Sequence, residues 1–332
     1  MKSRRDFFKD MGKGFASAYL VSSVASSDVS AAQREEKEVK KKRIRIGIIG
    51  AENSHSYGYG RIFNIQKEFP GVEVLYIWGE TDEFAKISSE RGQIPNIVKD
   101  PMEMMGKIDA LIVDHRHAMY HLEPALPFVK EGIPTFIDKP FCYRVSEGKE
   151  FLRVAREVGT PVSSYSTSAH NNGVFDMNAQ LSYIDNIYHI VITGPCDIYS
   201  KWGGVFFYGV HMVQQMIYIF GEDVEEVKVS MHGDKASASV VFSSGNFATL
   251  YFISRRRSGF YRWDILYLTN DGFKTLEPRI KNTDRLRPYR DMVEMFKTGK
   301  EPRTHESILK CVAILEALER SIETQQWEKV IV

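Results

Sequence analysis

The stretch from Ile44 to His55 constrains the fold more than any other, because apolar β-branched residues give way there to small and polar ones. Its first half, up to Ile49, predicts a buried strand. Gly50 then opens a turn at which a nucleotide phosphate could meet the N-terminus of a helix. With Gly47 at the strand end, the two glycines would provide the tight turn and the close backbone approach of a dinucleotide-binding loop. A buried parallel strand followed by any turn into a helix explains the same residues.

The polar half of this turn adds Asn53, Ser54 and His55 to the candidate cofactor contacts, beside the two glycines. Glu52 fits this interpretation less well. A carboxylate next to a pyrophosphate is repulsive unless it points away or caps the helix.

The first residues of the chain are typical of a targeting signal. Arg4 and Arg5 are followed by a mildly apolar run at 15–25 and by a small-residue site at 29–31. This pattern predicts a twin-arginine signal over residues 1–32 and export to the periplasm, with a disordered basic N-terminus as the alternative. The apolar run is too short and too rich in serine to span a bilayer, so we expect no membrane span. Residues 33–42 are charged without an apolar face and predict a solvated linker.

Composition limits what the remaining chain, about 290 residues, can be. This length exceeds one ordinary core, so we expect two domains. A formal net charge of +1 offers no field for nucleic acid, and 43% hydrophobic residues is typical of a globular protein. The three cysteines are scattered without metal-ligand spacing and are expected to be buried thiols.

Between residues 43 and 162, predicted strands and helices alternate with short loops. We expect strands at 72–78, 110–113 and 135–137, and helices at 82–91, 122–131 and 146–158. Such alternation predicts an α/β domain with a doubly wound parallel sheet, a Rossmann domain whose ligands bind at the carboxyl ends of the strands. Glu80, after the second strand, is the candidate partner for the ribose hydroxyls of the cofactor, and an exposed loop carboxylate is the alternative.

Three imidazoles, His115, His117 and His121, lie just past the strand at 110–113. No carboxylate or cysteine spacing completes a known metal site there, so we predict no metal. His121 is instead a candidate cofactor contact.

Residues 163–332 predict a second domain of different character. Short alternating strands are expected at 224–231, 237–242, 248–253, 263–268 and 273–276, with turn signals between them. This pattern predicts an α+β domain with a mainly antiparallel open sheet. Amphipathic helices at 287–297 and 306–324 are expected to pack back across both domains. The basic run Arg255–Arg257 is interpreted as a solvated or inter-subunit loop, with substrate anion binding as a minor option.

Two motifs resemble those of the glucose-fructose oxidoreductase, inositol dehydrogenase and rhizopine catabolism (Gfo/Idh/MocA) oxidoreductase family. The first is the segment Lys130–Pro140, in which a strand ends in Asp138-Lys139-Pro140 where the family has Glu-Lys-Pro. The second is the glycine-rich turn and helix start at 203–211, which ends in His211. The resemblance implies that Lys139 lies beside the nicotinamide and the substrate hydroxyl. It also implies that His211 exchanges the proton of that hydroxyl.

The resemblance further implies a nicotinamide cofactor and a homo-oligomer, a dimer or tetramer, formed through the C-terminal sheet. Either NAD or NADP fits, and Glu80 without an adjacent basic residue slightly favours NAD. The family usually carries an aspartate four residues before the histidine, where this chain has Phe207. That departure weakens the case for ordinary polyol dehydrogenation but does not affect the fold.

The segment 162–172, between the two motifs, offers hydroxyl, amide and imidazole groups that suit a neutral, hydroxyl-rich ligand, and a polar loop that caps a helix is the alternative. Trp202, just before the second motif, adds an aromatic face. The candidate substrate contacts are Tyr165, His170, Asn171, Trp202 and Tyr208. Together these features predict an exported nicotinamide-dependent oxidoreductase acting on a sugar, polyol or sugar derivative. Because free cofactor is scarce outside the cytoplasm, we expect it to stay tightly bound and to be recycled. The alternatives are a non-catalytic sugar- or nucleotide-binding member of the family and an NAD-dependent redox glycoside hydrolase.

Overall fold

The computed structural model describes residues 43–184, 186–254, 262–279 and 284–332. The predicted signal and linker and the run Arg255–Arg257 lie outside these residues. Among the described residues, no helix is both long enough and apolar enough to cross a membrane.

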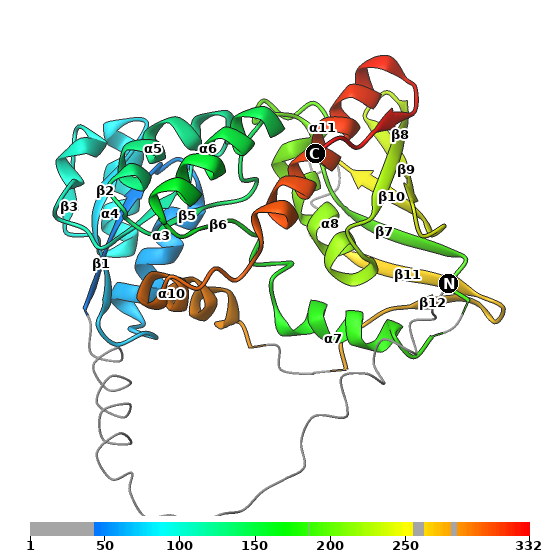
Figure 1. The fold of residues 1–332 in the computed structure, drawn as a ribbon, viewed down its shortest axis with the longest axis horizontal. Coiled ribbons are helices and arrows are strands. Elements are labelled where there is room, and N and C mark those ends of the chain that lie inside the picture. Colours follow the sequence, from blue (N-terminus) through cyan, green and yellow to red (C-terminus); the bar gives the residue numbers. More distant parts are fainter. Residues whose placement is uncertain (1–42, 185, 255–261, 280–283) are drawn as a thin grey trace, which may run out of the picture. The chain divides into compact units, whose positions relative to one another are not determined.

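The N-terminal part of the described chain forms a six-stranded parallel sheet (Figure 1). Its strands, in spatial order, are β3 (Asn96–Ile97), β2 (Val72–Trp78), β1 (Ile44–Ile49), β4 (Ala110–Val113), β5 (Thr135–Ile137) and β6 (Val162–Ser163). The connecting helices are α3 (Ser54–Gly60), α4 (Asp82–Gly92), α5 (Leu122–Lys130) and α6 (Val145–Val158). This is the doubly wound Rossmann order, in which the direction of winding reverses between β1 and β4. The predicted fold class is therefore confirmed for this part of the chain.

The turn after β1 is fixed by close packing against the end of β4. Gly50 has a φ of +104°, and a Cβ there would lie 2.7 Å from the backbone of Asp114 and His115. The strand ends at Ile49 as predicted, but Gly47 lies inside β1 rather than at its end, so Gly47 is not part of the turn. A Cβ on Gly47 would lie 2.7 Å from Met104 Sδ, which shows that this glycine makes room for a core side chain. Only Gly50 therefore belongs to the turn.

The C-terminal part is built on a seven-stranded mixed sheet. Its strands, in spatial order, are β12 (Gly272–Thr275), β11 (Asp264–Thr269), β7 (His189–Pro195), β10 (Phe247–Ile253), β9 (Lys235–Phe242), β8 (Val224–His232) and β13 (Glu328–Lys329). All pairs are antiparallel except β7 with β10, which confirms the predicted mainly antiparallel sheet. The sequence analysis missed β7, because a strand that pairs with partners distant in the chain leaves no hairpin signal.

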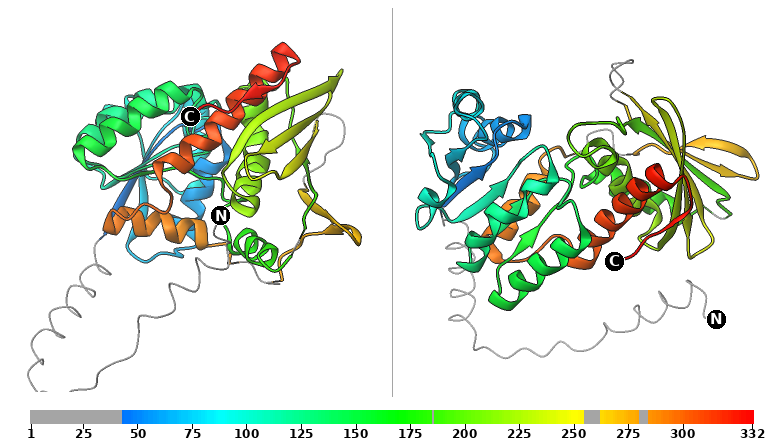
Figure 2. Two further views of the ribbon diagram at one scale, coloured as in Figure 1. Left: turned by 45° about the vertical axis from the view of Figure 1, so that its right-hand side comes forward. Right: turned by 90° about the horizontal axis from the view of Figure 1, so that it is seen from above.

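Helices α8 (Val205–Phe220) and α11 (His305–Thr324) cover one face of this sheet, as Figure 2 shows, and α7 (Asn172–Leu181) packs beside α8. Helix α10 (Arg287–Thr298) belongs to the other core, since Met292, Val293 and Phe296 are buried together with β1 residues. The chain thus returns to the Rossmann sheet after completing the second one. The remaining short elements are a π-helix at Arg61–Ile65 and 3-10 turns at Pro101–Met104 and Ala118–Tyr120.

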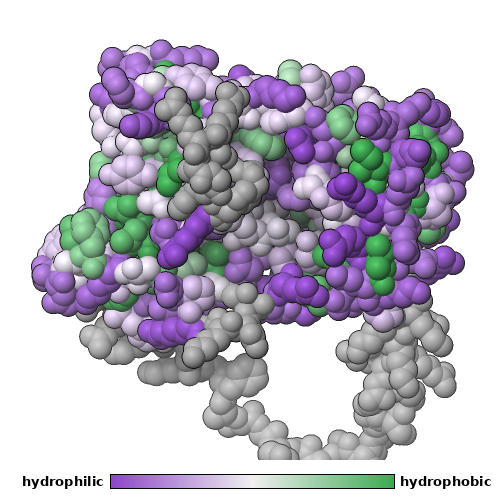
Figure 3. Space-filling model, turned by 180° about the vertical axis from the view of Figure 1, so that it is seen from behind, coloured by the Kyte–Doolittle hydropathy of each residue, from purple (hydrophilic) through white to green (hydrophobic). Residues whose placement is uncertain are grey.

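The surface seen in Figure 3 is mostly hydrophilic, and apolar residues on that face form small separate groups. All three cysteines are buried and free, as the sequence analysis predicted.

Candidate functional site

A group of polar side chains meets at the carboxyl ends of β1, β4 and β5. We call it the strand-end cluster and define it as Asn53, His55, Asp114, Asp138 and Lys139. Strand order explains the meeting, because β4 lies between β1 and β5, so all three strands end at one edge of the sheet. The cluster therefore occupies the position at which open α/β sheets bind their ligands.

Asp138 is the hub of the strand-end cluster and is 1% exposed. Its Oδ2 lies 3.0 Å from Lys139 Nζ and 3.1 Å from His55 Nδ1. Tyr59 donates its hydroxyl to Oδ1 at 3.3 Å. Burial alone would raise the pKa of Asp138, but Lys139 and His55 outweigh it and hold that pKa below its usual range. The Asp138 carboxylate is therefore ionised and shared between a buried ammonium and an imidazole.

Asp114 is fully buried and has a different charge state. Asn53 donates its amide to Asp114 Oδ1 at 2.8 Å, whereas Oδ2 has no hydrogen-bond partner. Burial, followed by repulsion from Asp138, raises the pKa of Asp114 well above its ordinary value. Two carboxyl groups so close together do not both ionise readily, so Asp114 carries the proton.

His211 lies on α8 and is 9% exposed. Its Nδ1 is 2.6 Å from Ser166 Oγ and 3.1 Å from Ser168 Oγ. We call these two residues, Ser166 and Ser168, the serine pair. Burial, Lys139 and His55 together lower the pKa of His211 well below its ordinary value. Lys139 and His55 both act electrostatically on His211, so the imidazole lies within reach of the charges of the strand-end cluster.

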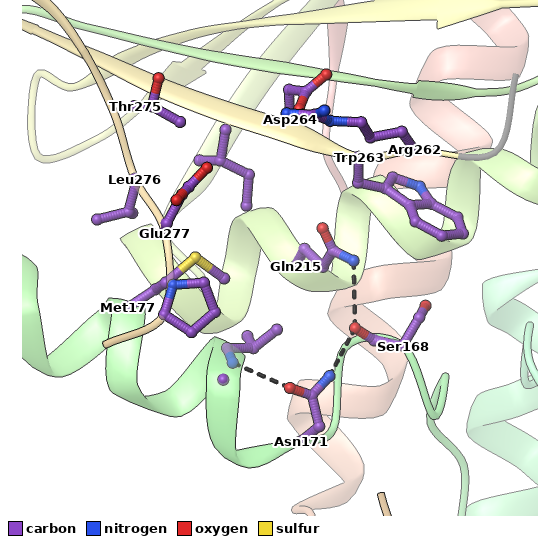
Figure 4. A pocket seen from close by; sticks show the side chains of 14 residues that line it. Ser168, Asn171, Met177, Gln215, Arg262, Trp263, Asp264, Thr275, Leu276 and Glu277 are labelled. Atoms are coloured by element: carbon purple, nitrogen blue, oxygen red, sulfur yellow. Dashed lines mark hydrogen bonds and ion pairs between the residues drawn. The ribbon is translucent and has the colours of Figure 1, made fainter. Parts of the chain in front are cut away.

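A cavity of about 660 Å³ lies beside the serine pair, between α7, α8, β11 and the segment that follows β12 (Figure 4). Ser168, Asn171 and Gln215 line one side, and Gln215 and Asn171 both donate to the Ser168 carbonyl. Trp263 lines the cavity and also packs 5.6 Å from the His211 ring, centre to centre. The cavity thus places hydroxyl, amide and aromatic groups next to His211.

A second cavity, of about 700 Å³, lies at the carboxyl ends of β2 and β4. Its walls are mainly apolar and are formed by Trp78, Pro101, Met102, Tyr120, Pro124 and Pro127, with Glu80 among them. Glu80 Oε2 accepts the backbone N–H groups of Ala51 and Glu52, at 2.8 and 2.9 Å. Glu80 Oε1 is buried without a partner. An unpaired carboxylate oxygen in an apolar cavity needs a donor from a ligand.

His121 joins the two loops that follow β4 and β5. Its Nδ1 lies 2.8 Å from the Pro140 carbonyl and its Nε2 lies 2.9 Å from the His115 carbonyl. It is fully buried, and burial lowers its pKa. The neutral ring donates its single N–H to one of these two carbonyls, and its contacts with both loops place His121 as a positioning residue. Burial lowers the pKa of its neighbour His115 to about 3.

Two predicted substrate contacts lie away from the site. Tyr165 is fully buried, and its hydroxyl donates to the Pro288 carbonyl at 2.6 Å. His170 stacks on Tyr165 and bonds to Asp291 and Tyr218, where it lines a separate cavity. Sequence position alone could not show that the chain turns these two rings into the packing between α10 and α8.

The remaining predicted substrate contacts lie closer to His211 and the cavity than Tyr165 and His170 do. Asn171 caps α7 and lines the cavity beside the serine pair, as Figure 4 shows. Tyr208 packs against the His211 ring at 5.5 Å. Trp202 lies between the cations of Arg116 and Lys201. Ser54 is exposed at the first position of α3.

Ligand atoms of His55, Asp114 and Asp138 lie within 4.8 Å of one another, a spacing that metal sites share. However, the Lys139 ammonium and the Asn53 amide already bind these carboxylate oxygens. The Lys139 ammonium, 3.0 Å from Asp138 Oδ2, already supplies positive charge to the cluster.

Residues 44–166 match the model of the Gfo/Idh/MocA oxidoreductases, described as an oxidoreductase family with an NAD-binding Rossmann fold. Over these residues the chain is therefore similar to the Rossmann domain of that family. No curated protein sequence matches the chain significantly.

Solved structures extend the likeness to the second sheet. Myo-inositol dehydrogenase from Lactobacillus casei, in complex with NAD(H) and myo-inositol, aligns with a TM-score of 0.74 at 13% identity over 87% of this chain and 97% of its own. Scyllo-inositol dehydrogenase from the same organism gives 0.73 at 13% identity, over 87% of this chain and 99% of its own. The WlbA dehydrogenase of Bordetella pertussis, with NADH and UDP-GlcNAcA, gives 0.71 at 15% identity, over 88% and 100%. At these identities the likeness establishes the two-sheet fold.

The residues of this Rossmann domain fit a dinucleotide. The cavity between β2 and β4 offers apolar walls to an adenine ring, and Glu80 Oε1 offers an unused acceptor to a ribose hydroxyl. Lys139, at the end of β5, lies where the reactive end of the cofactor would come. These two observations concern opposite ends of one ligand.

Sequence reasoning missed Asp114 and the serine pair as parts of the site. An aspartate directly after a strand is a usable signal for Asp114 in a parallel sheet. Ser166 and Ser168 give no such signal, since their partner His211 lies more than forty residues later and meets them only through folding.

Proposed function

We propose that this protein is an NAD(H)-dependent oxidoreductase acting on a CH–OH group of a cyclic polyol, a sugar or a sugar derivative. The observation that supports the proposal is that His211 bonds to two serines in the loop after β6, and that β6 pairs with β5, the strand that ends next to Lys139. A lysine ammonium and an imidazole are the groups that alcohol oxidation requires at the reacting oxygen.

The nicotinamide, when bound, accepts or returns the hydride. Lys139 donates a hydrogen bond to the substrate oxygen and stabilises negative charge as the hydroxyl proton leaves. Asp138 holds the ammonium in place through its 3.0 Å contact. His211, whose Nδ1 is held by the serine pair, would contact the same oxygen through its other ring nitrogen. The burial of these groups excludes water and strengthens each contact.

The cavity beside His211 supports a hydroxyl-rich substrate. Ser168, Asn171 and Gln215 offer donors and acceptors, and Trp263 offers a ring face. The solved relatives with inositol and with a nucleotide sugar favour the same chemical class. Glu80 favours NAD over NADP, because its carboxylate would repel a ribose phosphate.

The test begins with the cofactor. The purified full chain is denatured, and any released nucleotide is identified by mass spectrometry. Thermal unfolding is then measured with added NAD⁺, NADH, NADP⁺ and NADPH. We expect NAD(H) to be released or to raise the unfolding temperature. Hydride transfer is then measured as reduced-nicotinamide absorbance with myo-inositol, scyllo-inositol and UDP-sugars. A protein that neither releases nor responds to any of the four nucleotides is a non-catalytic relative, and the proposal fails.

A variant of Glu80 tests the cofactor orientation. Glu80→Gln keeps an oxygen that can accept the backbone N–H groups of Ala51 and Glu52. It replaces the unpaired, charged Oε1 with an uncharged amide group. Loss of a charged hydrogen bond is worth about 1.5–3 kcal/mol, or roughly a ten- to hundredfold weaker NADH affinity. Glu52→Gln is the matched control, because Glu52 belongs to the same turn but does not line the cavity. Equal NADH affinity in both variants would contradict the assignment of Glu80.

A further inference from the structure

The site contains two imidazoles in opposite environments. His211 is 9% exposed, and its ring contacts hydroxyl groups and aromatic rings. The nearby Lys139 ammonium opposes a second positive charge on it. A base must hold the proton that it takes. The surroundings of His211 raise the free energy of its protonated form, so this ring is poorly suited to accept a proton from the substrate.

His55 has the opposite surroundings. It lies in the first turn of α3, and 37% of its side chain is exposed. Its Nδ1 lies 3.1 and 3.2 Å from the two oxygens of Asp138, a buried carboxylate that stays ionised. A carboxylate at this nitrogen accepts its N–H, fixes the tautomer, and stabilises the ring when it becomes charged. The other nitrogen, Nε2, is then the free acceptor.

His55 also lies within the site that contains Lys139 and His211. It contacts the carboxylate that binds Lys139, and it acts electrostatically on His211. The titratable groups near it come from two strand ends and two helices, namely Asp138, Lys139, Asp114, Tyr59 and His211. Asp138 alone among these is an ionised carboxylate, and it is the group that contacts the His55 ring.

We propose that the His55–Asp138 pair is the proton-transfer base of this site and that His211 orients the substrate. The inference rests on the proposed function. In oxidation, the substrate O–H and C–H bonds break and a C=O bond forms. The proton passes to His55 Nε2, and the hydride passes to the nicotinamide of NAD⁺. The exposed face of the imidazolium then releases the proton to water, and reduction follows the reverse path.

The test compares His55→Ala with His211→Ala in the full chain, using NAD⁺ and whichever of myo-inositol, scyllo-inositol or UDP-sugars the wild type oxidises. Loss of a general base lowers kcat by about 10²- to 10⁴-fold. Added imidazole should restore part of the His55→Ala activity, because that side chain is partly exposed. The His211→Ala cavity is buried, so imidazole should not restore that variant. A His55→Ala variant with wild-type kcat overturns the proposal. So does one that binds NADH normally but shows no imidazole rescue.

A readout without substrate keeps the two proposals separable. The hydrogen bond between His55 and Asp138 should give a downfield imidazole proton in the NMR spectrum of the ring-¹⁵N-histidine protein. That signal should disappear in His55→Gln and remain in His211→Gln. Its absence from the wild type overturns the His55–Asp138 pair, whether or not the protein oxidises any polyol. Its presence in a wild type that binds no nicotinamide nucleotide supports the pair and refutes only the proposed function.

Discussion

The strand-end cluster and the serine pair each hold an imidazole, His55 and His211 respectively, but through different interactions. His55 faces an ionised carboxylate that is shared with a lysine, whereas His211 is held by two uncharged hydroxyl groups. The first arrangement is suited to moving charge, and the second to fixing a ring in place. One site thus combines a charged side built from strand ends with an uncharged side built from a loop and a helix.

The largest expected effect comes from removing the charge at the centre of the cluster. Asp138→Asn leaves the buried Lys139 ammonium without its carboxylate, and breaking a buried ion pair costs about 3–5 kcal/mol. Urea unfolding measures this loss. Asp109→Asn is the matched control, because its pair with Arg45 is partly exposed and is expected to contribute at most about 1 kcal/mol. Similar losses in the two variants would show that the cluster is an ordinary ion pair.

The pH dependence of the stability difference between wild type and Asp138→Asn tests the charge state of Asp138. The folded-state pKa of Asp138 lies below its ordinary value, so the stabilisation is present above the ordinary value. It is lost as the pH falls through the folded-state pKa. The difference between wild type and variant should therefore be constant near neutrality and shrink only in acid. A difference that shrinks as the pH rises would contradict an ionised Asp138.

Lys139→Met tests whether the strand-end cluster takes part in the proposed oxidation. Its hydrocarbon chain keeps the volume but removes the donor, so kcat should fall about 10²- to 10³-fold while NADH affinity changes little. Steady-state kinetics with the identified polyol and a NADH titration measure the two quantities. Lys201→Met, which removes an exposed lysine over Trp202, is the control and should retain wild-type turnover. Unchanged turnover in Lys139→Met would remove the charged side from the reaction.

The two sides also differ in how far the sequence could predict them. Lys139 follows a strand in a short motif, and Gly50, Asn53 and His55 lie in one continuous turn. A short stretch of sequence was therefore enough to name them as candidates. The partnership of Asp114 with Asn53 depends on strand order, which places two distant strand ends together. The serine pair depends on the packing of α8 against the loop after β6. Alternating elements predicted both sheets, but β7 was missed because its partners lie far along the chain.

Asp114→Asn separates the two carboxyl groups of the cluster. The pKa of Asp114 is raised by burial and by Asp138, so the folded protein holds that proton more tightly than the unfolded chain does. The resulting stabilisation is complete below the ordinary carboxyl pKa and is lost as the pH rises through the folded-state value. The asparagine stays uncharged throughout. We therefore expect the variant to gain stability over wild type with rising pH, by the order of 1 kcal/mol or more, in urea unfolding at several pH values. A variant that loses stability as the pH rises would show Asp114 to be ionised.

The smallest effect belongs to the uncharged side. Ser166→Ala removes the 2.6 Å contact to His211 Nδ1, and with it the Ser166 Oγ contacts to the hydroxyl and backbone N–H of Ser168, but leaves Ser168 at 3.1 Å, so the ring keeps one partner. Each lost neutral hydrogen bond costs about 1 kcal/mol of unfolding free energy, and turnover should fall less than tenfold. Ser166→Ala with Ser168→Ala should lose more than the sum of the single variants, because only the double variant leaves Nδ1 unpaired. Additive losses, or a pH profile of kcat that shifts with either serine, would make the serine pair part of proton transfer and would erase the distinction between the two imidazoles.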